Sequence, residues 1–162
     1  MNNRNLKIVL VAFVSLGALL WAIQNVVNLG SAYQSVAYVT SNVDHTAYPK
    51  SFSPAITSPV LVWLALIIIL VGEFAAGLLA AKGVFDMYAC RRRTAAEFHA
   101  AKRFAVLGCG AAVIVWFGIF TVIGGAYFQM WQTEIGDASF RGALHYATIN
   151  AAILIFVEMS DQ

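Results

Sequence analysis

Charged residues are scarce in this sequence. Asp, Glu, Lys and Arg make up 11% of the 162 residues, whereas 60% are hydrophobic and the mean hydropathy is +0.75. A soluble domain usually carries about 25% charged residues. The shortage therefore excludes an ordinary soluble protein, and with a net charge of only +2 we expect no nucleic-acid partner.

Residues that hold metals or act in catalysis are also few. The two cysteines, Cys90 and Cys109, match no zinc-binding spacing and lie on the side where thiols are expected to stay reduced. Among the three histidines only His145 falls in a predicted span, whereas haem held between spans usually needs a pair. The sequence has no nucleophile elbow, phosphate-binding glycine loop or histidine–glutamate metalloprotease motif. We therefore predict that the protein is not an enzyme and holds no metal or cofactor.

Long apolar runs are what the sequence does contain. A helix needs about 20 apolar residues to cross a hydrocarbon layer of roughly 30 Å. Four runs of this kind predict spans at about 8–29, 60–82, 104–128 and 141–159, of which the last is the weakest. Closed β-barrels also span membranes, but their strands alternate polar and apolar residues, which these runs do not. The predicted fold is all-α: one integral membrane four-helix bundle formed by residues 1–162.

The basic residues are distributed unevenly between the predicted loops. Only Lys50 and Arg141 lie on one side. The rest lie on the side of the termini and of the basic inner loop 83–103: Arg4, Lys7, Lys82, Arg91, Arg92, Arg93, Lys102 and Arg103. Cytoplasmic segments carry such an excess of Lys and Arg. Both termini are therefore predicted to be cytoplasmic, with an outer loop at 30–59 and a short outer loop at 129–140.

Three local patterns predict structure near the ends of the spans. Residues 31–42 place apolar side chains at helical spacing, which favours a short interfacial helix at the start of the outer loop. Pro59 is suited to the first turn of the second span. Thr94 and Glu97 form a capping-box pattern, which predicts a helix that begins near Ala95 and continues unbroken into the third span.

Glu73 is the most unusual residue, because it is an acid near the middle of a span, where insertion costs a few kcal/mol. It is either a proton, cation or ligand site, or a neutral carboxyl that hydrogen-bonds across helices and fixes their packing. We expect Asn150 at similar depth to reach it, with Thr121 as a further partner. The intramembrane polar candidates are Glu73, Asn150, Gln24, Asn25, Asn28 and His145, of which Gln24, Asn25 and Asn28 lie nearer the outer face.

Small residues recur around Glu73 at helical spacing. They are Gly72, Ala76, Gly77, Ala80 and Gly83. Small residues let two helices approach closely, and Gly108 with Ala112 on the third span offers a facing surface. We interpret this stripe as helix packing, with the partner helix in this chain or in another.

Two further groups of residues are candidates for contacts at the membrane surfaces. At the end of the third span, an outer-face motif combines two glycines with aromatic and polar residues: Gly124, Gly125, Tyr127, Phe128, Met130, Trp131 and Gln132. We interpret it mainly as the exit of the helix, an aromatic belt and a packing point for the first span or the outer loop. The candidates for anionic lipid head groups are Arg91, Arg92, Arg93, Lys102 and Arg103.

Short signatures in a fixed order run along nearly the whole chain. They are Gln24-Asn25, Ala55-Ile56-Thr57-Ser58-Pro59, Glu73, Phe98, Ala101-Lys102-Arg103, Trp116-Phe117, Gly124-Gly125, Phe128, Met130-Trp131-Gln132 and Leu154-Ile155-Phe156-Val157. By these residues the chain resembles the bacterial family of predicted small integral membrane proteins, domain of unknown function 2165. The family pattern has an acid after the glycine pair and an arginine before Ala55, where this chain carries Ala126 and Pro54. The resemblance implies four spans in a bacterial inner membrane and no particular activity.

These observations favour a non-enzymatic accessory or interaction subunit of a membrane assembly, whose partners are membrane lipids and other membrane subunits or a second copy. Two alternatives stay open. One is a small transporter or channel that uses Glu73 as a proton or cation coupling site, and the other is a haem- or quinone-associated subunit with His145 as the candidate ligand.

Overall fold

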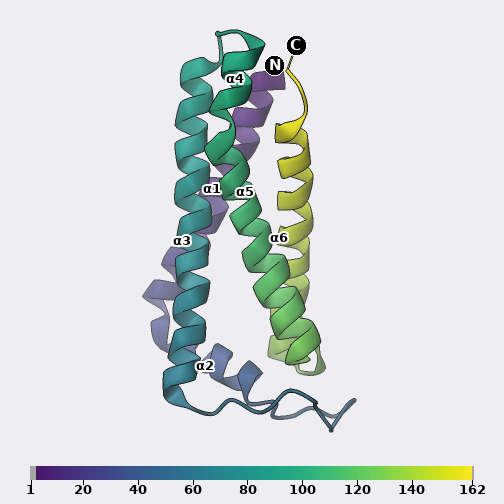
Figure 1. Cartoon of the computed structure of the whole chain (residues 1–162). Coiled ribbons are helices and arrows are strands. Elements are labelled where there is room, and N and C mark those ends of the chain that lie inside the picture. Colours follow the sequence, from purple (N-terminus) through teal and green to yellow (C-terminus); the bar gives the residue numbers. More distant parts are fainter. Residues whose placement is uncertain (1–2, 162) are drawn as a thin grey trace.

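The computed structural model describes residues 3–161, in which all the regular secondary structure is helical and no strand occurs. The helices are α1 (Asn3–Val27), α2 (Leu29–Thr40), α3 (Pro59–Cys90), α4 (Ala95–Ala101), α5 (Arg103–Val113), η1 (Ile114–Tyr127), η2 (Met130–Gln132) and α6 (Glu134–Glu158). Figure 1 shows a long bundle in which both termini lie at one end, called here the terminal end. Helix α2 and the longest loop lie at the opposite end, called the far end.

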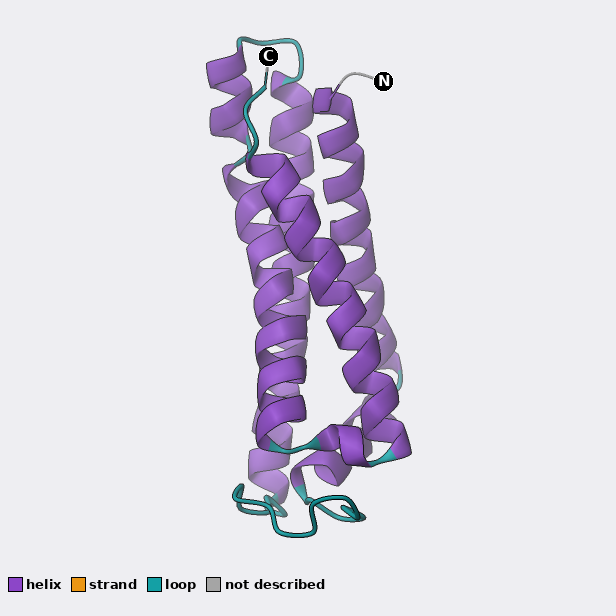
Figure 2. Ribbon diagram, turned by 90° about the vertical axis from the view of Figure 1, so that its right-hand side faces the viewer, coloured by secondary structure: helices purple, strands orange, loops and turns teal. Residues whose placement is uncertain are grey.

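Within the described residues, four helices are long and apolar enough to cross a membrane: α1, α3, the segment Ala95–Tyr127, and α6. This confirms the all-α fold with four candidate spans. A short helix expected over residues 31–42 is present as α2 (Leu29–Thr40), and α3 begins at Pro59 as predicted. Loops gather at the two ends of the bundle (Figure 2).

The helices extend further than the apolar runs. Helix α3 continues to Cys90, so the segment 83–103, expected as a loop, is mostly helical and turns only at residues 91–94. Helix α6 likewise begins at Glu134, inside the segment expected as the short outer loop. The physical reason is that hydropathy detects the edge of the hydrocarbon layer, whereas a helix ends where its backbone hydrogen bonding ends.

The third span begins with the predicted capping box. Thr94 Oγ1 accepts a hydrogen bond from Glu97 N at 3.3 Å, and Glu97 Oε2 accepts one from Thr94 N at 3.0 Å. The helix is interrupted only by a local distortion at Lys102. From Ile114 to Tyr127 its turns widen to the π type, in which backbone groups bond across five residues.

The small-residue stripe packs α3 against its neighbours, as predicted. Gly108 lies so close to α3 that a Cβ added to it would be 2.3 Å from Ala80 N, and a Cβ on Gly83 would be 2.2 Å from Ala105 N. A Cβ on Gly77 would lie 2.6 Å from Leu19 Cγ on α1. Toward the far end α3 and η1 diverge (Figure 1). The bundle is therefore tight at the terminal end and more open at the far end.

Candidate functional site

Glu73 lies in the interior of the bundle on α3, with only 2% of its surface exposed. Asn25 Nδ2 on α1 donates to both carboxylate oxygens, at 3.2 Å to Oε1 and 3.0 Å to Oε2. The expected partners differ: Asn150 is buried on α6 without a hydrogen bond to Glu73, and Thr121 Oγ1 donates to Trp116 O instead. The prediction of Asn150 and Thr121 as partners is therefore wrong.

The direction of helical side chains explains this difference. Side chains lean toward the N-terminus of their own helix. Because α1 and α3 run antiparallel, Glu73 leans toward the far end and Asn25 leans toward the terminal end. Counting residues from the helix ends places Glu73 and Asn25 at different depths in the membrane, but their side chains lean toward each other and meet.

A cavity of about 440 Å³ reaches Glu73 from the far half of the bundle. Its lining comes from five elements: Trp21 and Asn25 of α1; Ala32, Ser35 and Val36 of α2; Leu66, Ile69 and Glu73 of α3; Trp116 and Phe120 of η1; and Ala138, Ser139, Gly142, Ala143 and Tyr146 of α6. One of its aromatic rings, that of Tyr146, contacts two others. Trp116 stacks on Tyr146 with ring centroids 5.1 Å apart, and Trp21 meets Tyr146 edge to face at 6.0 Å. The cavity thus combines one carboxylate with an aromatic wall.

A second cavity of about 310 Å³ adjoins the first and shares five lining residues with it: Ser35, Val36, Ile69, Phe120 and Ser139. Its other walls are mostly apolar, with Val39, Ile68, Ile119, Ile123 and Phe128 among them. The two cavities together extend from the Glu73 carboxylate to an apolar region between α2, α3 and η1.

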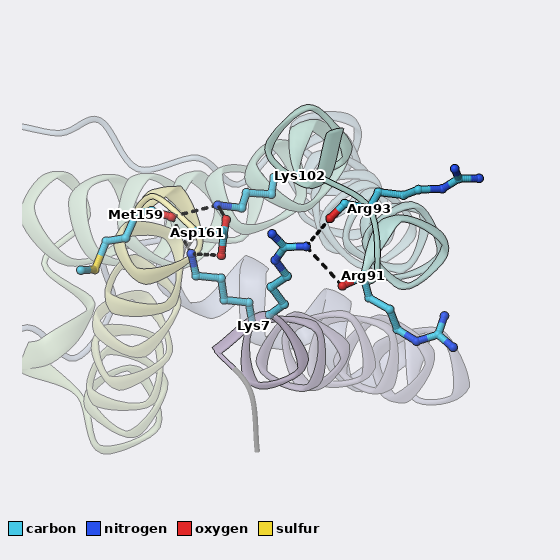
Figure 3. Close-up of polar contacts among 7 residues, drawn as sticks. Lys7, Arg91, Arg93, Lys102, Met159 and Asp161 are labelled. Carbon is cyan, nitrogen blue, oxygen red and sulfur yellow. Dashed lines mark hydrogen bonds and ion pairs between the residues drawn. The ribbon is translucent and has the colours of Figure 1, made fainter. Parts of the chain in front are cut away.

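A cluster of buried charges closes the terminal end, and is called here the terminal cluster: Arg4, Lys7, Lys102 and Asp161. Lys7 Nζ lies 2.9 Å from Asp161 Oδ1, and Lys102 pairs with Oδ2 of the same carboxylate. The side chains of both lysines and of Asp161 are at most 2% exposed. Both ammonium groups also donate to Met159 O, at 2.5 Å and 2.9 Å (Figure 3). The tail after α6 is therefore held against α1 and the start of the third span.

Arg4 completes the terminal cluster on the side of the turn between α3 and α4. Its Nη1 donates to Arg93 O at 2.6 Å and to Arg91 O at 3.3 Å, and its guanidinium lies 5.0 Å from the centre of the Phe98 ring. Arg4 therefore ties α1 to the turn between α3 and α4. Sequence reasoning missed this cluster because the positive-inside rule already accounted for its basic residues.

The pKa of Asp161 lies below its ordinary value. Burial raises it, but hydrogen bonds and charges from Lys102 and Lys7 lower it by more. A carboxyl with a depressed pKa in the folded state contributes stability above its unfolded pKa, and this stability is lost as the pH falls through the folded pKa. We therefore expect the difference in thermal midpoint between the wild type and Asp161→Asn to stay constant from about pH 8 to about pH 5 and to close only below about pH 3.9. Midpoints measured in one detergent across this range test it, and a difference that closes near neutral pH would contradict it.

The outer-face motif closes the far end of the bundle. Gly124 and Gly125 admit close neighbours, since an added Cβ would lie 2.8 Å from Met130 Sδ and 2.4 Å from Phe140 Cε2, respectively. The close neighbours are thus the turn after η1 and the first part of α6, and not the first span near Asn25 or the outer loop. Phe128 is only 7% exposed, so it packs inside instead of lying in an aromatic belt.

Gln132 joins the long loop after α2 to the turn after η1. Tyr48 N donates to Gln132 Oε1 at 2.7 Å, and Gln132 Nε2 donates to Gln129 Oε1 at 2.7 Å. Aromatic pairs support this junction: Trp131 meets the Tyr48 ring at 5.7 Å, and Tyr127 meets Phe52 at 5.3 Å. The polar and aromatic residues of the motif thus hold the long loop over the far end.

The remaining predicted residues lie apart from the cavities. Gln24 and Asn28 are exposed at the end of α1, where Asn28 Nδ2 donates to Gln24 O at 3.0 Å, and His145 is exposed on α6. Arg92, Arg93 and Arg103 are exposed, and Arg91 is half-buried with its guanidinium over the Tyr88 ring. Lys102 does not fit its expected place among head-group residues, because it is buried in the terminal cluster. Within residues 3–161 no group of three or more His, Cys, Asp or Glu side chains is placed to hold a metal ion.

The comparisons with known proteins agree with this architecture. The family model described as predicted small integral membrane protein (DUF2165) matches residues 3–160, which confirms the resemblance. Neither a curated protein nor a solved structure matches the chain. With nearly every residue covered and four helices able to cross a membrane, the chain belongs to the DUF2165 family of predicted small integral membrane proteins.

Proposed function

We propose that this integral membrane protein binds a positively charged ligand at Glu73, without acting as an enzyme. The observation that carries the proposal is the cavity of about 440 Å³ with the Glu73 carboxylate in its wall. Among residues 3–161 no Lys, Arg or His forms an ion pair with Glu73. Asn25 donates to both oxygens but brings no charge, so the carboxylate keeps acceptor sites for a ligand.

The tight packing between Glu73 and the terminal end favours a binding site over an open channel. Ala76 and Ala80 on α3, and Ala105 and Ala112 on α5, have no exposed surface. They close the bundle between Glu73 and the terminal end. A transporter that uses Glu73 as a proton or cation coupling site is the second candidate, and the buried carboxylate in the wall of a cavity is what favours it. It predicts a cation or proton flux in liposomes that Glu73→Gln abolishes.

Access to the carboxyl group tests the binding proposal directly. The lipid-soluble reagent N,N′-dicyclohexylcarbodiimide should modify one carboxyl group per chain, at Glu73, in protein held in lipid nanodiscs. Glu73→Gln should reduce the modification by about tenfold or more, because the group in the cavity is the one that the reagent reaches. Peptide mass spectrometry identifies the site. As the matched control, Glu158→Gln removes an exposed acid from the end of α6 and should leave the labelling unchanged. An unlabelled Glu73 would refute the proposal.

An accessory role in a membrane assembly is compatible with binding at Glu73. It is supported by the small mass outside the helices and by apolar side chains on the outer surface of α3, such as Val60, Leu64 and Val71. A stable partner in fixed stoichiometry after purification in mild detergent would support it, and a clean monomer from several detergents would count against it. A haem or quinone subunit would show a Soret band or an extractable quinone.

The orientation and location follow from the distribution of charge. We infer that the termini face the cytoplasm of a bacterium and that the protein is a multi-pass protein of the inner membrane. The support is that the turn of Arg91, Arg92 and Arg93 between α3 and α4 lies at the terminal end, whereas Lys50 lies in the long loop and Arg141 in the first part of α6, toward the far end. Reporter fusions at either terminus test this, since a reporter active only in the cytoplasm should work at both.

A further inference from the structure

The cavity at Glu73 opens sideways, between α1, α2 and α6. Several of its lining residues are exposed: Trp21 on α1 is 46% exposed, and Ser35, Ser139 and Gly142 are exposed as well. A Cβ added to Gly142 would meet nothing within 4 Å, so the space in front of this residue is open. Trp21 and Gly142 both belong to helices that are long and apolar enough to cross a membrane. The mouth of the cavity therefore faces the lipid leaflet on the side of the far end.

The chemistry of the walls selects one class of ligand. An aromatic face attracts a cation, and a carboxylate in a site without water attracts it more strongly. Trp116 and Tyr146 supply two stacked rings that line the same cavity as Glu73. An anionic lipid would be repelled by the carboxylate, and a hard cation such as Ca²⁺ or Mg²⁺ usually takes six or more oxygen ligands. An organic cation needs only the carboxylate and the rings.

The second cavity supplies a place for an apolar chain. It shares Val36, Ile69 and Phe120 with the first, and Ile68, Ile123 and Phe128 are among its further lining residues. A single amphipathic molecule can therefore place its charged group at Glu73 and its chain in the adjoining space.

We propose that the ligand is an amphipathic organic amine, which passes from the lipid leaflet through the mouth between α1, α2 and α6 and places its ammonium group on Glu73. This inference rests on the proposed function, since it names the ligand class and the route for the same site. The ammonium group donates to the carboxylate, and the apolar chain occupies the second cavity.

Protection of Glu73 from the carbodiimide tests the ligand class. N,N-dimethyldodecylamine is a tertiary amine, which the carbodiimide-activated carboxyl cannot convert to an amide. Added to the protein in nanodiscs of zwitterionic lipid, it should slow the modification of Glu73 by about tenfold, because the ammonium pairs with the carboxylate in a desolvated site. Dodecanol has the same chain without the charge and should not protect. Equal protection by both compounds, or by neither, would overturn the inference. If Glu73 is labelled but not protected, the ligand class fails while the cavity stands; if Glu73 is never labelled, the proposed function fails first.

Occlusion of the mouth tests the route. Gly142→Leu places a side chain in the open space and should slow the labelling of Glu73 by about fivefold or more. The matched control is Gly110→Leu, because Gly110 on α5 also has nothing within 4 Å of an added Cβ but lies away from the cavity. Both variants should unfold at the wild-type temperature. Labelling that is unchanged by Gly142→Leu, or slowed equally by both variants, would overturn the lateral route.

Discussion

Asp161→Asn should lower the free energy of unfolding by about 3 kcal/mol, since the loss of one partner leaves buried charges without compensation. The carboxylate pairs with both Lys7 and Lys102, whose side chains are 2% exposed. Without it, two ammonium groups face each other at the terminal end with only Met159 O as a shared acceptor. The tail after α6 should then leave the bundle, because its main attachment is lost. Unfolding in mixed detergent, followed by circular dichroism, measures the change.

An exposed ion pair on α6 provides the control. Asp137 and Arg141 form an ion pair at 2.7 Å, one turn apart, and their side chains are 32% and 73% exposed. Exposed pairs of this kind are worth about 0.5 kcal/mol or less. Asp137→Asn should therefore change the stability little. Equal effects of the two substitutions would mean that the terminal cluster is solvated and does not hold the tail.

The architecture of this protein was predictable because a bilayer admits few kinds of backbone structure. In lipid every backbone group must be satisfied within the segment, so long apolar runs become helices. Pro59 and the Thr94–Glu97 pair then fixed the start of α3 and α4, since both act through local backbone geometry. The ends of α3 and α6 were not predictable from hydropathy, because residues such as Lys82 and Asp86 continue the helix in water with a pair one turn apart.

The contacts of the candidate site were only partly predictable. Glu73 stood out because an acid within a span is rare, but its partner depends on which way the side chains of two antiparallel helices lean. The cavities depend on the divergence of α3 and η1, for which the sequence has no local signal. Asp161 lies 154 positions from Lys7, and a lone acid near the chain end shows no pattern before the helices are assembled. Each of these features arises from tertiary packing.

Gly108→Ala should destabilise the bundle by about 2 kcal/mol, although alanine is the better helix former. The added methyl group would lie 2.3 Å from Ala80 N and 2.6 Å from Ala80 Cα, and a backbone cannot turn away as a flexible side chain can. The α3 and α5 helices would have to separate, which would also move Gly83 from Ala105.

Gly110→Ala, two residues along the same helix, meets nothing within 4 Å and should leave the stability unchanged or raise it. Thermal midpoints of the two variants in the same detergent measure the contrast. A fall for both would assign the effect to glycine flexibility in α5, whereas a fall for Gly108→Ala alone assigns it to the close approach of α3. In a membrane that close approach provides the packing that holds the helices together, because the lipid supplies no hydrophobic drive for their association.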